Sequence, residues 1–431
     1  MSLIYKFPLK MHVGAPCKAL AEKGDKVQRG QLIGEPQGLG AKIHSSVSGD
    51  VLEVNENEIV VQAYENQSSD YIKIKECESI AETIYEAGIV GAGGAGFPTH
   101  VKFSGDITGG YIIANCVECE PLLKHNVKYI EDNSADFLRG VKYAMEAAKA
   151  KEAIVAIKKK NKNAINAIKK ELINFSNISI HEMEDIYPMG EERAIIHSIF
   201  DKWLEPTQLP LDAKCIVLNC ETLSNITRAV EERKPVIDKD VTVAGKVKNA
   251  NKEEIFMQVP VGTPIKELIE KSGGIDGEYG EIVLGGPYTG KSGDYENDIV
   301  TKTLGGIIVT IPLPEFKGKM GLLVCACGAN EERLRDLASK MGATVTEVLK
   351  CKNVEEIRGV NKCKTPGDCP GQAQVVLKFK KAGSERLLIS NCSDCSNTVM
   401  NCAPQMGLGV YHHTDHIFRT VDHEITRRLK K

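Results

Sequence analysis

Short apolar runs that end in polar loops recur along the chain and predict the strands of parallel sheets. Residues 111–114 precede a loop with an amide and two acids, and residues 216–218 precede a similar loop and a helical pattern. A third run, residues 322–324, ends in two cysteines before another helical pattern. Buried strands that alternate with helices are typical of an α/β fold, in which ligands lie beyond the carboxyl ends of the strands.

Residues 5–54 show a different pattern of short runs divided by turn residues, which predicts a small β domain. The pattern Gly-Asp-x-Val-x-x-Gly-Gln-x-Ile within residues 22–34 resembles the barrel-sandwich hybrid of lipoyl and biotinyl carriers. A carrier needs a lysine at the apex of an exposed hairpin, and the corresponding turn at residues 44–49 has none. We therefore expect this hairpin to be a scaffold and not a swinging arm.

A glycine-rich stretch at residues 90–103 is the strongest indication of a ligand site. Four of the residues from 91 to 96 are glycine, so the backbone there can approach an anionic or flat ligand closely. Phe97 then supplies an aromatic face, and Lys102 supplies a positive charge. These parts suit a planar, phosphate-bearing cofactor; the alternative is that the glycines only form turns.

Three polar loops complete the pattern, at residues 115–121, 187–193 and 219–225. Together with the glycine-rich stretch, they resemble the flavin- and NADH-binding subunit of respiratory complex I and the C subunit of the Rnf electron-transport complex. The resemblance implies an α/β domain that holds FMN, with NADH stacked on the flavin. The residues that it implies for binding these cofactors are Gly91, Gly93, Gly94, Phe97, Lys102, Asn115, Glu118, Glu120, Tyr187, Gly190, Glu191, Glu192, Asn219 and Thr222.

The same resemblance assigns roles to these residues. Gly91, Gly93 and Lys102 would line the phosphate side of FMN. The residues implied at the flavin ring or the ribityl chain are Asn115, Glu118, Asn219 and Thr222. Those implied at NADH are Phe97 at the adenine, and Glu120 with Glu191 or Glu192 at the hydroxyls or the nicotinamide. The chain departs from the complex I pattern at Ala92, where complex I has an arginine.

The composition is that of a large globular protein with several domains. Of its 431 residues, 42% are hydrophobic and 26% are charged. The formal net charge of −3 argues against a nucleic-acid-binding surface, which would be strongly basic. The lysine-rich residues 158–170 have helical spacing and predict a solvated helix face. No apolar run approaches the ~18 residues of a membrane span and no signal peptide is evident, so we expect a cytoplasmic protein.

Fourteen cysteines distinguish the chain, and without a secretion signal we do not expect them to form a disulfide framework. The eight that follow Val324 are Cys325, Cys327, Cys351, Cys363, Cys369, Cys392, Cys395 and Cys402. Cys325 and Cys327 come between a predicted strand and a predicted helix, where the helix N-terminus lowers thiol pKa values. We therefore predict that this pair relays electrons as redox-active thiols.

Two other interpretations of these cysteines stay open. One is an iron–sulfur cluster with Cys392, Cys395 and Cys402 as ligands and Cys369 or Cys363 as the fourth, although the C-x₂-C-x₂-C-x₃-C-P spacing of the Rnf C subunit is absent. The other is inert packing in the core. His412 and His416 have the spacing of metal ligands on one helical face, with a polar loop or a partner-docking surface as the alternative.

A thiol-rich tail in place of ferredoxin-like motifs resembles the proline reductase-associated electron transfer proteins of amino-acid-fermenting anaerobes. This likeness spans nearly the whole chain. It implies a soluble flavoprotein that oxidises NADH through FMN and passes electrons by its C-terminal cysteines to a partner reductase, D-proline reductase. Two other functions stay open: a C subunit of an Rnf complex at a membrane, or a cofactor-free adaptor that docks a reductase.

The predicted architecture is a multidomain α/β protein. The expected domains are a barrel-sandwich hybrid at residues 1–75, an FMN- and NADH-binding α/β domain of the complex I type at 76–237, a β-grasp (SLBB) domain at 238–315 and a cysteine-rich α/β domain at 316–431.

Overall fold

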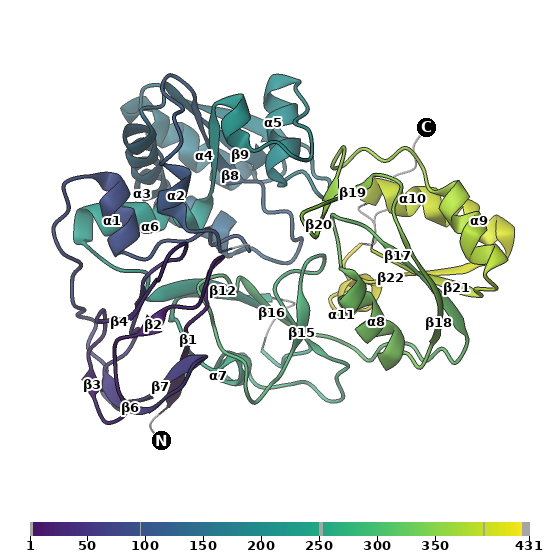
Figure 1. Cartoon of the computed structure of the whole chain (residues 1–431), viewed down its shortest axis with the longest axis horizontal. Coiled ribbons are helices and arrows are strands. Elements are labelled where there is room, and N and C mark those ends of the chain that lie inside the picture. Colours follow the sequence, from purple (N-terminus) through teal and green to yellow (C-terminus); the bar gives the residue numbers. More distant parts are fainter. Residues whose placement is uncertain (1–2, 95, 250–252, 391–392, 425–431) are drawn as a thin grey trace.

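The computed structural model describes residues 3–94, 96–249, 253–390 and 393–424, with side chains left out at residues 393–397. Within these ranges the strands form six sheets. Figure 1 shows four structural parts that follow one another along the chain and meet near the centre of the molecule. No helix in the described ranges is both long enough and apolar enough to cross a membrane.

The N-terminal part is a small β domain, as predicted. Its larger sheet is antiparallel and contains, in spatial order, β1 (Ile4–Pro8), β7 (Glu58–Ala63), β6 (Gly49–Val54) and β3 (Lys26–Val27). Its smaller sheet contains β2 (Lys18–Ala19), β4 (Leu32–Glu35) and β5 (Ile43–His44). Ile59, Val61 and Ala63 alternate along β7 and point into a core shared with Phe7. This alternation is the period-2 pattern of a strand with one buried face.

The second part is built on a parallel sheet, which confirms the α/β prediction. Its strands, in spatial order, are β10 (Ile178–Met183), β9 (Glu152–Lys158), β8 (Tyr111–Cys116) and β11 (Cys215–Asn219). Its helices are α1 (Ile80–Glu86), α2 (Thr99–Lys102), α3 (His125–Ala148), α4 (Lys162–Glu171), η1 (Leu172–Asn174), α5 (Glu192–Phe200), η2 (Pro210–Ala213) and α6 (Cys220–Glu232). Ile112 and Ile113 pack in two different cores, so both faces of the sheet are covered.

The third part is a mixed sheet below the parallel one in Figure 1. In spatial order it contains β13 (Glu253–Pro260), β12 (Asp238–Gly245), β16 (Gly306–Val309), β14 (Ile282–Leu284) and β15 (Lys291–Gly293), with α7 (Ile265–Lys271) packed on it. Its loops reach the carboxyl ends of β8 and β11. That this part is a β-grasp domain stays a prediction.

The C-terminal part contains a second parallel sheet. Its strands, in spatial order, are β18 (Thr344–Lys350), β17 (Lys319–Val324), β21 (Arg386–Ile389) and β22 (Gly409–His412). Its helices are α8 (Glu331–Lys340), α9 (Ala373–Lys381), α10 (Ser393–Cys402), η3 (Pro404–Met406) and α11 (Asp415–Thr420). A hairpin of β19 (Val354–Ile357) and β20 (Val360–Cys363) leaves this sheet and extends toward the second part (Figure 1).

Buried ion pairs fix the parts relative to one another. The pairs that cross between parts are Arg29–Asp238, Glu221–Lys239 and Glu281–Arg333. A buried charge that loses its partner costs several kcal/mol, so these contacts strongly favour one relative arrangement. The cavity described below depends on this arrangement, because three of the four parts contribute to its wall.

His412 and His416 do not share a helix, so the predicted helical metal pair is wrong. His412 ends β22, whereas His416 lies in α11, after the chain has turned. His416 Nε2 instead lies 2.8 Å from Glu281 Oε1 in the third part. Burial would raise the pKa of Glu281, but its hydrogen bonds with His416 and Arg333 hold that pKa well below the ordinary value. Both histidines therefore belong to the packed junction between the third and fourth parts.

Candidate functional site

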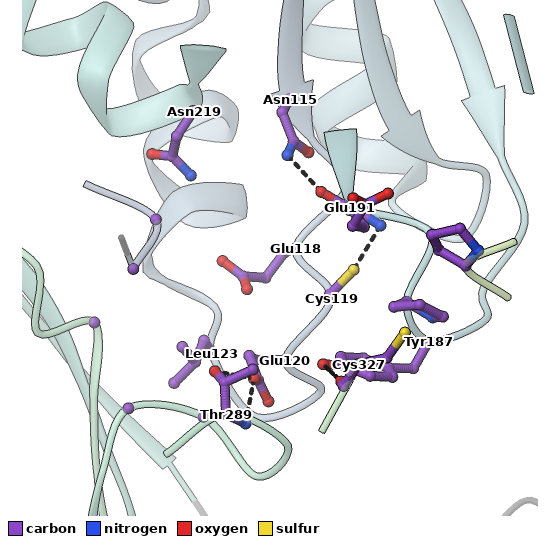
Figure 2. A pocket seen from close by; sticks show the side chains of 18 of the residues that line it. Asn115, Glu118, Cys119, Glu120, Leu123, Tyr187, Glu191, Asn219, Thr289 and Cys327 are labelled. Carbon is purple, nitrogen blue, oxygen red and sulfur yellow. Dashed lines mark hydrogen bonds between the residues drawn. The ribbon is translucent and has the colours of Figure 1, made fainter. Parts of the chain in front are cut away.

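A cavity of about 410 Å³ lies where the carboxyl ends of β8 and β11 meet loops from the third and fourth parts. Its volume is in the range of about 300–1,000 Å³ that small-molecule sites occupy. Figure 2 shows Asn115, Asn219 and Glu118 on one side of the space, with Tyr187 and Cys327 on another. The cavity therefore lies where α/β sheets place their ligands, and it also reaches the cysteine-rich part.

The glycine-rich stretch forms one edge of this cavity with its backbone. A Cβ atom at Gly93 would lie only 2.9 Å from Asn219 Nδ2, so a side chain at this position would displace the amide. Gly94 has φ +133°, a conformation that favours glycine, and nothing lies within 4 Å of where its Cβ would be. Its backbone is consequently open to a ligand.

Thr222 fixes the glycine-rich loop from below, although it does not line the cavity. Its hydroxyl accepts a hydrogen bond from the Ala92 N–H at 3.0 Å and donates one to the Val90 carbonyl at 3.2 Å. The side chain is fully buried. The resemblance places Thr222 at the flavin, whereas the structure gives it the role of positioning the loop.

Asn115 and Asn219 are register partners at the ends of β8 and β11. Asn115 Nδ2 donates to the Gly190 carbonyl at 2.9 Å. Asn219 caps α6, since its Oδ1 accepts from the Glu221 N–H at 2.9 Å, and this leaves its Nδ2 beside Gly93. The pairing of the two strands therefore brings together two amides that are far apart in the sequence.

Glu118 is the titratable group best placed to hold a proton in the cavity. Its backbone has φ 38°, and its Oε2 accepts from Asn126 Nδ2 at 2.9 Å. Burial raises the pKa of Glu118 to about 7, against the opposing effect of that hydrogen bond. A carboxyl group with a pKa near neutrality can take up and release a proton at physiological pH.

Glu120 also lines the cavity, but its carboxylate is already engaged. It accepts hydrogen bonds from the Tyr288 N–H, the Thr289 N–H and the Thr289 hydroxyl at 2.7–2.9 Å. A Cβ at Gly286 would lie 2.2 Å from the same side chain, so the loop approaches Glu120 very closely. Glu120 thus ties the third part to the loop after β8, and its predicted contact with NADH stays a prediction.

Arg193 provides a buried positive charge that the sequence analysis missed. Its Nε donates to Glu191 Oε1 at 3.0 Å, and Glu191 also caps α5 by accepting from the Arg193 and Ala194 N–H groups. Arg193 is only 5% exposed, yet among the described residues no acceptor satisfies its Nη1. A buried, unpaired guanidinium donor in a cavity wall is suited to an anionic ligand group.

Lys102 and Glu192 pair with each other outside the cavity lining. Lys102 Nζ donates to Glu192 Oε1 at 2.9 Å and to the Val217 carbonyl at 2.8 Å. Phe97 and Gly91 also lie outside the lining. The flavin- and NADH-binding roles that the resemblance gave these four residues stay predictions that the geometry does not favour.

The predicted residues thus divide into two groups. Those that line the cavity are Gly93, Gly94, Asn115, Glu118, Glu120, Tyr187, Gly190, Glu191, Asn219 and Cys327. Those outside its lining are Gly91, Phe97, Lys102, Glu192, Thr222 and Cys325. Lining residues that the sequence analysis did not assign include Asn126, Arg193 and Thr289; Cys363, which it named only as an alternative cluster ligand, lines the cavity as well. The signal that could have found Arg193 is its positive charge directly after two glutamates, at the end of the predicted polar loop 187–193.

Cys325 and Cys327 follow β17, as predicted, but only Cys327 reaches the cavity. The hydroxyl of Tyr187 donates to the Cys327 carbonyl, and the Tyr187 ring stacks on Tyr288 with centroids 3.7 Å apart. Hydrogen bonds with Cys325 and Cys363, together with burial, raise the pKa of Cys327. The expectation of a lowered pKa is therefore wrong for Cys327; α8 begins only at Glu331, four residues further along the chain.

Of the four proposed iron–sulfur ligands, the structure describes the side chains of Cys369 and Cys402, and it places them in different cores. Among the described residues, no group of three or more His, Cys, Asp or Glu side chains is arranged to hold a metal ion. Cys369 packs with Tyr187 and Tyr288, whereas Cys402 packs beside a different core and donates to the Val399 carbonyl. Cys392 and the side chain of Cys395 lie outside the described part of the chain.

Comparison with known proteins identifies the two N-terminal parts. Residues 84–228 match the Nuo51 FMN-binding domain, and residues 3–76 match the RnfC barrel sandwich hybrid domain. The C subunit of the Na(+)-translocating ferredoxin:NAD(+) oxidoreductase complex from Acetobacterium woodii is 30% identical over 321 residues, 70% of this chain and 72% of the relative. The chain belongs to the Rnf C-subunit family. It is an electron-transfer flavoprotein of that family.

Two other similarities are more limited. Cobalamin reductase PduS from Salmonella typhimurium is 36% identical over 232 residues, 54% of this chain and 50% of the reductase, so the chain spans about half the length of that relative. An NAD+-reducing [NiFe]-hydrogenase in its air-oxidized state has a TM-score of 0.46 and 20% identity, over 54% of this chain and 46% of the hydrogenase. This second likeness carries no functional argument.

The residues of the cavity fit FMN, the group that the matched domain implies. Gly93 and Gly94 present bare backbone, and Asn219 Nδ2 lies beside it; Asn115 also lines the cavity, with its amide bonded to Gly190 and Val117. The unpaired Nη1 of Arg193 is suited to the phosphate. Arg193 lines the cavity, whereas Lys102 lies outside its lining.

Proposed function

We propose that this chain oxidises NADH through FMN bound in the cavity and passes the electrons through C-terminal thiols to a partner reductase. FMN, when bound, supplies the chemistry of accepting a hydride from NADH and releasing electrons onward. One observation carries the proposal: Cys327, from the cysteine-rich part, lines the same cavity as Gly93 and Asn219. A cytoplasmic location follows from NADH as the donor.

The residues around the cavity have distinct tasks in this proposal. Asn115 and Asn219 orient the flavin by their amides, and Arg193 holds its phosphate. Glu118, with its pKa near 7, takes up or releases the proton that accompanies two-electron transfer. The stacked rings of Tyr187 and Tyr288 hold the Cys327 loop against the cavity and exclude water from that wall.

D-proline reductase is the partner that we propose, on the basis of the sequence resemblance alone. The second candidate is a role as the C subunit of a membrane-bound Rnf complex. Two relatives are named as C subunits of such complexes and favour this candidate. One is the Acetobacterium woodii subunit described above, and the other is the C subunit of the proton-translocating ferredoxin:NAD(+) oxidoreductase complex from Clostridium ljungdahlii, which is 31% identical over 305 residues. The two candidates share the cavity and differ only in the acceptor.

The test uses the purified full chain under anaerobic conditions. We expect FMN to bind with one flavin per chain and to lose its absorption when NADH is added. Adding D-proline reductase and D-proline should then restore the oxidised flavin spectrum and consume NADH. A colourless chain that takes up no FMN would contradict the proposal and favour the adaptor function. If NADH reduces the flavin but only Rnf-containing membrane vesicles reoxidise it, the partner is the Rnf complex and not D-proline reductase.

A further inference from the structure

The β19–β20 hairpin brings a second thiol to the cavity. Cys363 is the last residue of β20, and it lines the same cavity wall as Cys327. The two side chains are close enough for each to shift the pKa of the other, and Cys325 acts on Cys327 in the same way. Cys325, the neighbour predicted from the sequence, lies outside the lining; both Cys325 and Cys363 are buried, at 3% and 7% exposure, so the lining is what distinguishes them.

The two thiols differ in their electrostatic surroundings. The hydrogen bond with Cys327 lowers the pKa of Cys363, assisted by the Thr365 backbone and the positive charge of Arg193. The same hydrogen bond is among the causes that raise the pKa of Cys327. A thiolate stabilised by the S–H of its partner is the arrangement found in reactive dithiol pairs.

We propose that Cys327 and Cys363 form a reversible, redox-active disulfide at the cavity wall, which exchanges electrons with the disulfide of an acceptor protein. This inference deepens the proposed function and rests on it for the source of the electrons. It replaces Cys325 by Cys363 as the partner of Cys327.

The exchange balances without any further reactant. The Cys363 thiolate attacks one sulfur of the acceptor disulfide, so that a mixed disulfide forms and the second acceptor sulfur leaves as a thiolate, which takes up a proton. The Cys327 thiol then loses its proton and attacks Cys363, which releases the first acceptor sulfur as a thiol. Two electrons and two protons pass to the acceptor, and Cys327 and Cys363 are left as a disulfide.

The hairpin also offers a place for the acceptor to approach. Val360, at the start of β20, is 57% exposed and lies on the rim of the cavity with Asn361 and Lys362. By contrast, Cys351 and Cys369 both accept a hydrogen bond from Gln372 Nε2 at 3.2 Å, so the fold holds both of these thiols in place.

The experiment maps disulfides in the FMN-free full chain, so that its result does not depend on flavin chemistry. The reduced protein is equilibrated with oxidised dithiothreitol, its remaining thiols are alkylated, and it is cleaved after glutamate residues for mass spectrometry. Cys325 and Cys327 lie in one fragment, and Cys363 lies in another. We expect a cross-link between these fragments and the loss of two titratable thiols per chain.

The variants identify which thiols take part. Cys325→Ser should retain the cross-link, whereas Cys327→Ser and Cys363→Ser should each abolish it; Cys369→Ser should retain it as well. A disulfide between Cys325 and Cys327, seen as a lighter fragment without a cross-link, would overturn the inference, as would wild-type protein that loses no thiols. Failure of the proposed function would appear separately, as wild-type protein that binds no FMN.

Discussion

Two parallel sheets direct the carboxyl ends of their strands at one cavity, and they present different chemistry to it. The strands β8 and β11 end in amides, an acid and a glycine-rich loop, which are groups that bind and orient. The strand β17 ends in thiols, which are groups that react. Under the proposed function, one sheet holds the cofactor and the other passes its electrons on.

The largest effect should come from filling the glycine edge of the cavity. Gly93→Val would push its side chain against Asn219, whose Nδ2 lies 2.9 Å from the position of a Cβ. We expect FMN affinity to fall about 100-fold, since overpacking and a displaced amide together cost about 3 kcal/mol. Quenching of flavin fluorescence on titration measures this affinity.

Gly91→Ala is the matched control for this change. A Cβ at Gly91 would be 3.8 Å from its nearest neighbours, which is an ordinary contact, so affinity should change less than about threefold. Formation of the Cys327–Cys363 disulfide should survive in both variants, because it belongs to the other sheet. Equal losses of FMN binding in the two variants would show that Gly93 has no special role at the cavity and that the glycines serve only to form the turn.

Thr222→Val tests whether the loop must be held from below. The change keeps the shape but removes the hydroxyl that bonds the Ala92 N–H and the Val90 carbonyl. Leaving a buried N–H group unsatisfied costs about 2 kcal/mol of unfolding free energy, and we expect about a tenfold loss of FMN affinity. Urea unfolding and the same flavin titration measure the two effects. Thr222→Ser, which restores a hydroxyl, should recover most of both.

The two sheets also differ in how much of them could be predicted. Asn115 and Asn219 were predictable because each follows a buried apolar run, and parallel strands end at one edge. Cys363 was not, because it reaches Cys327 only through a hairpin that leaves its sheet. Motifs show which residues are near each other along the chain but not where their side chains point. The position of Thr222 beneath the glycine-rich loop therefore could not be predicted from its motif.

Glu118→Gln separates the proton chemistry from the binding. The raised pKa of Glu118 means that the folded state binds a proton more tightly than the unfolded state does. The resulting stability is present below the ordinary carboxyl pKa of about 4.5 and is lost as the pH rises through about 7. Glutamine stays neutral, so at pH 8 the FMN-free variant should be more stable than the wild type by roughly 1–2 kcal/mol.

Urea unfolding between pH 5 and pH 8 checks this prediction. The difference between variant and wild type should grow with pH, and two parallel curves would show that Glu118 does not titrate in this range. Because Asn126 can still donate to the glutamine oxygen, the hydrogen bond itself is retained. Oxidation of the thiols should follow the same pH profile in both proteins.

The smallest effect should come from Lys102, the cation that the family resemblance places at the FMN phosphate. Its ammonium pairs with Glu192, whose side chain is 42% exposed, and such pairs contribute up to about 1 kcal/mol. Lys102→Met should therefore change FMN affinity less than about threefold.

Arg193→Met removes the buried guanidinium with the unpaired Nη1, and FMN affinity should fall at least about tenfold, because charge-assisted hydrogen bonds to phosphate contribute about 1.5–3 kcal/mol. Riboflavin, which lacks the phosphate, should bind both variants and the wild type alike. If Lys102→Met proved the more damaging of the two, the phosphate would lie on the far side of the glycine-rich loop, and the cavity would hold the flavin in the opposite orientation.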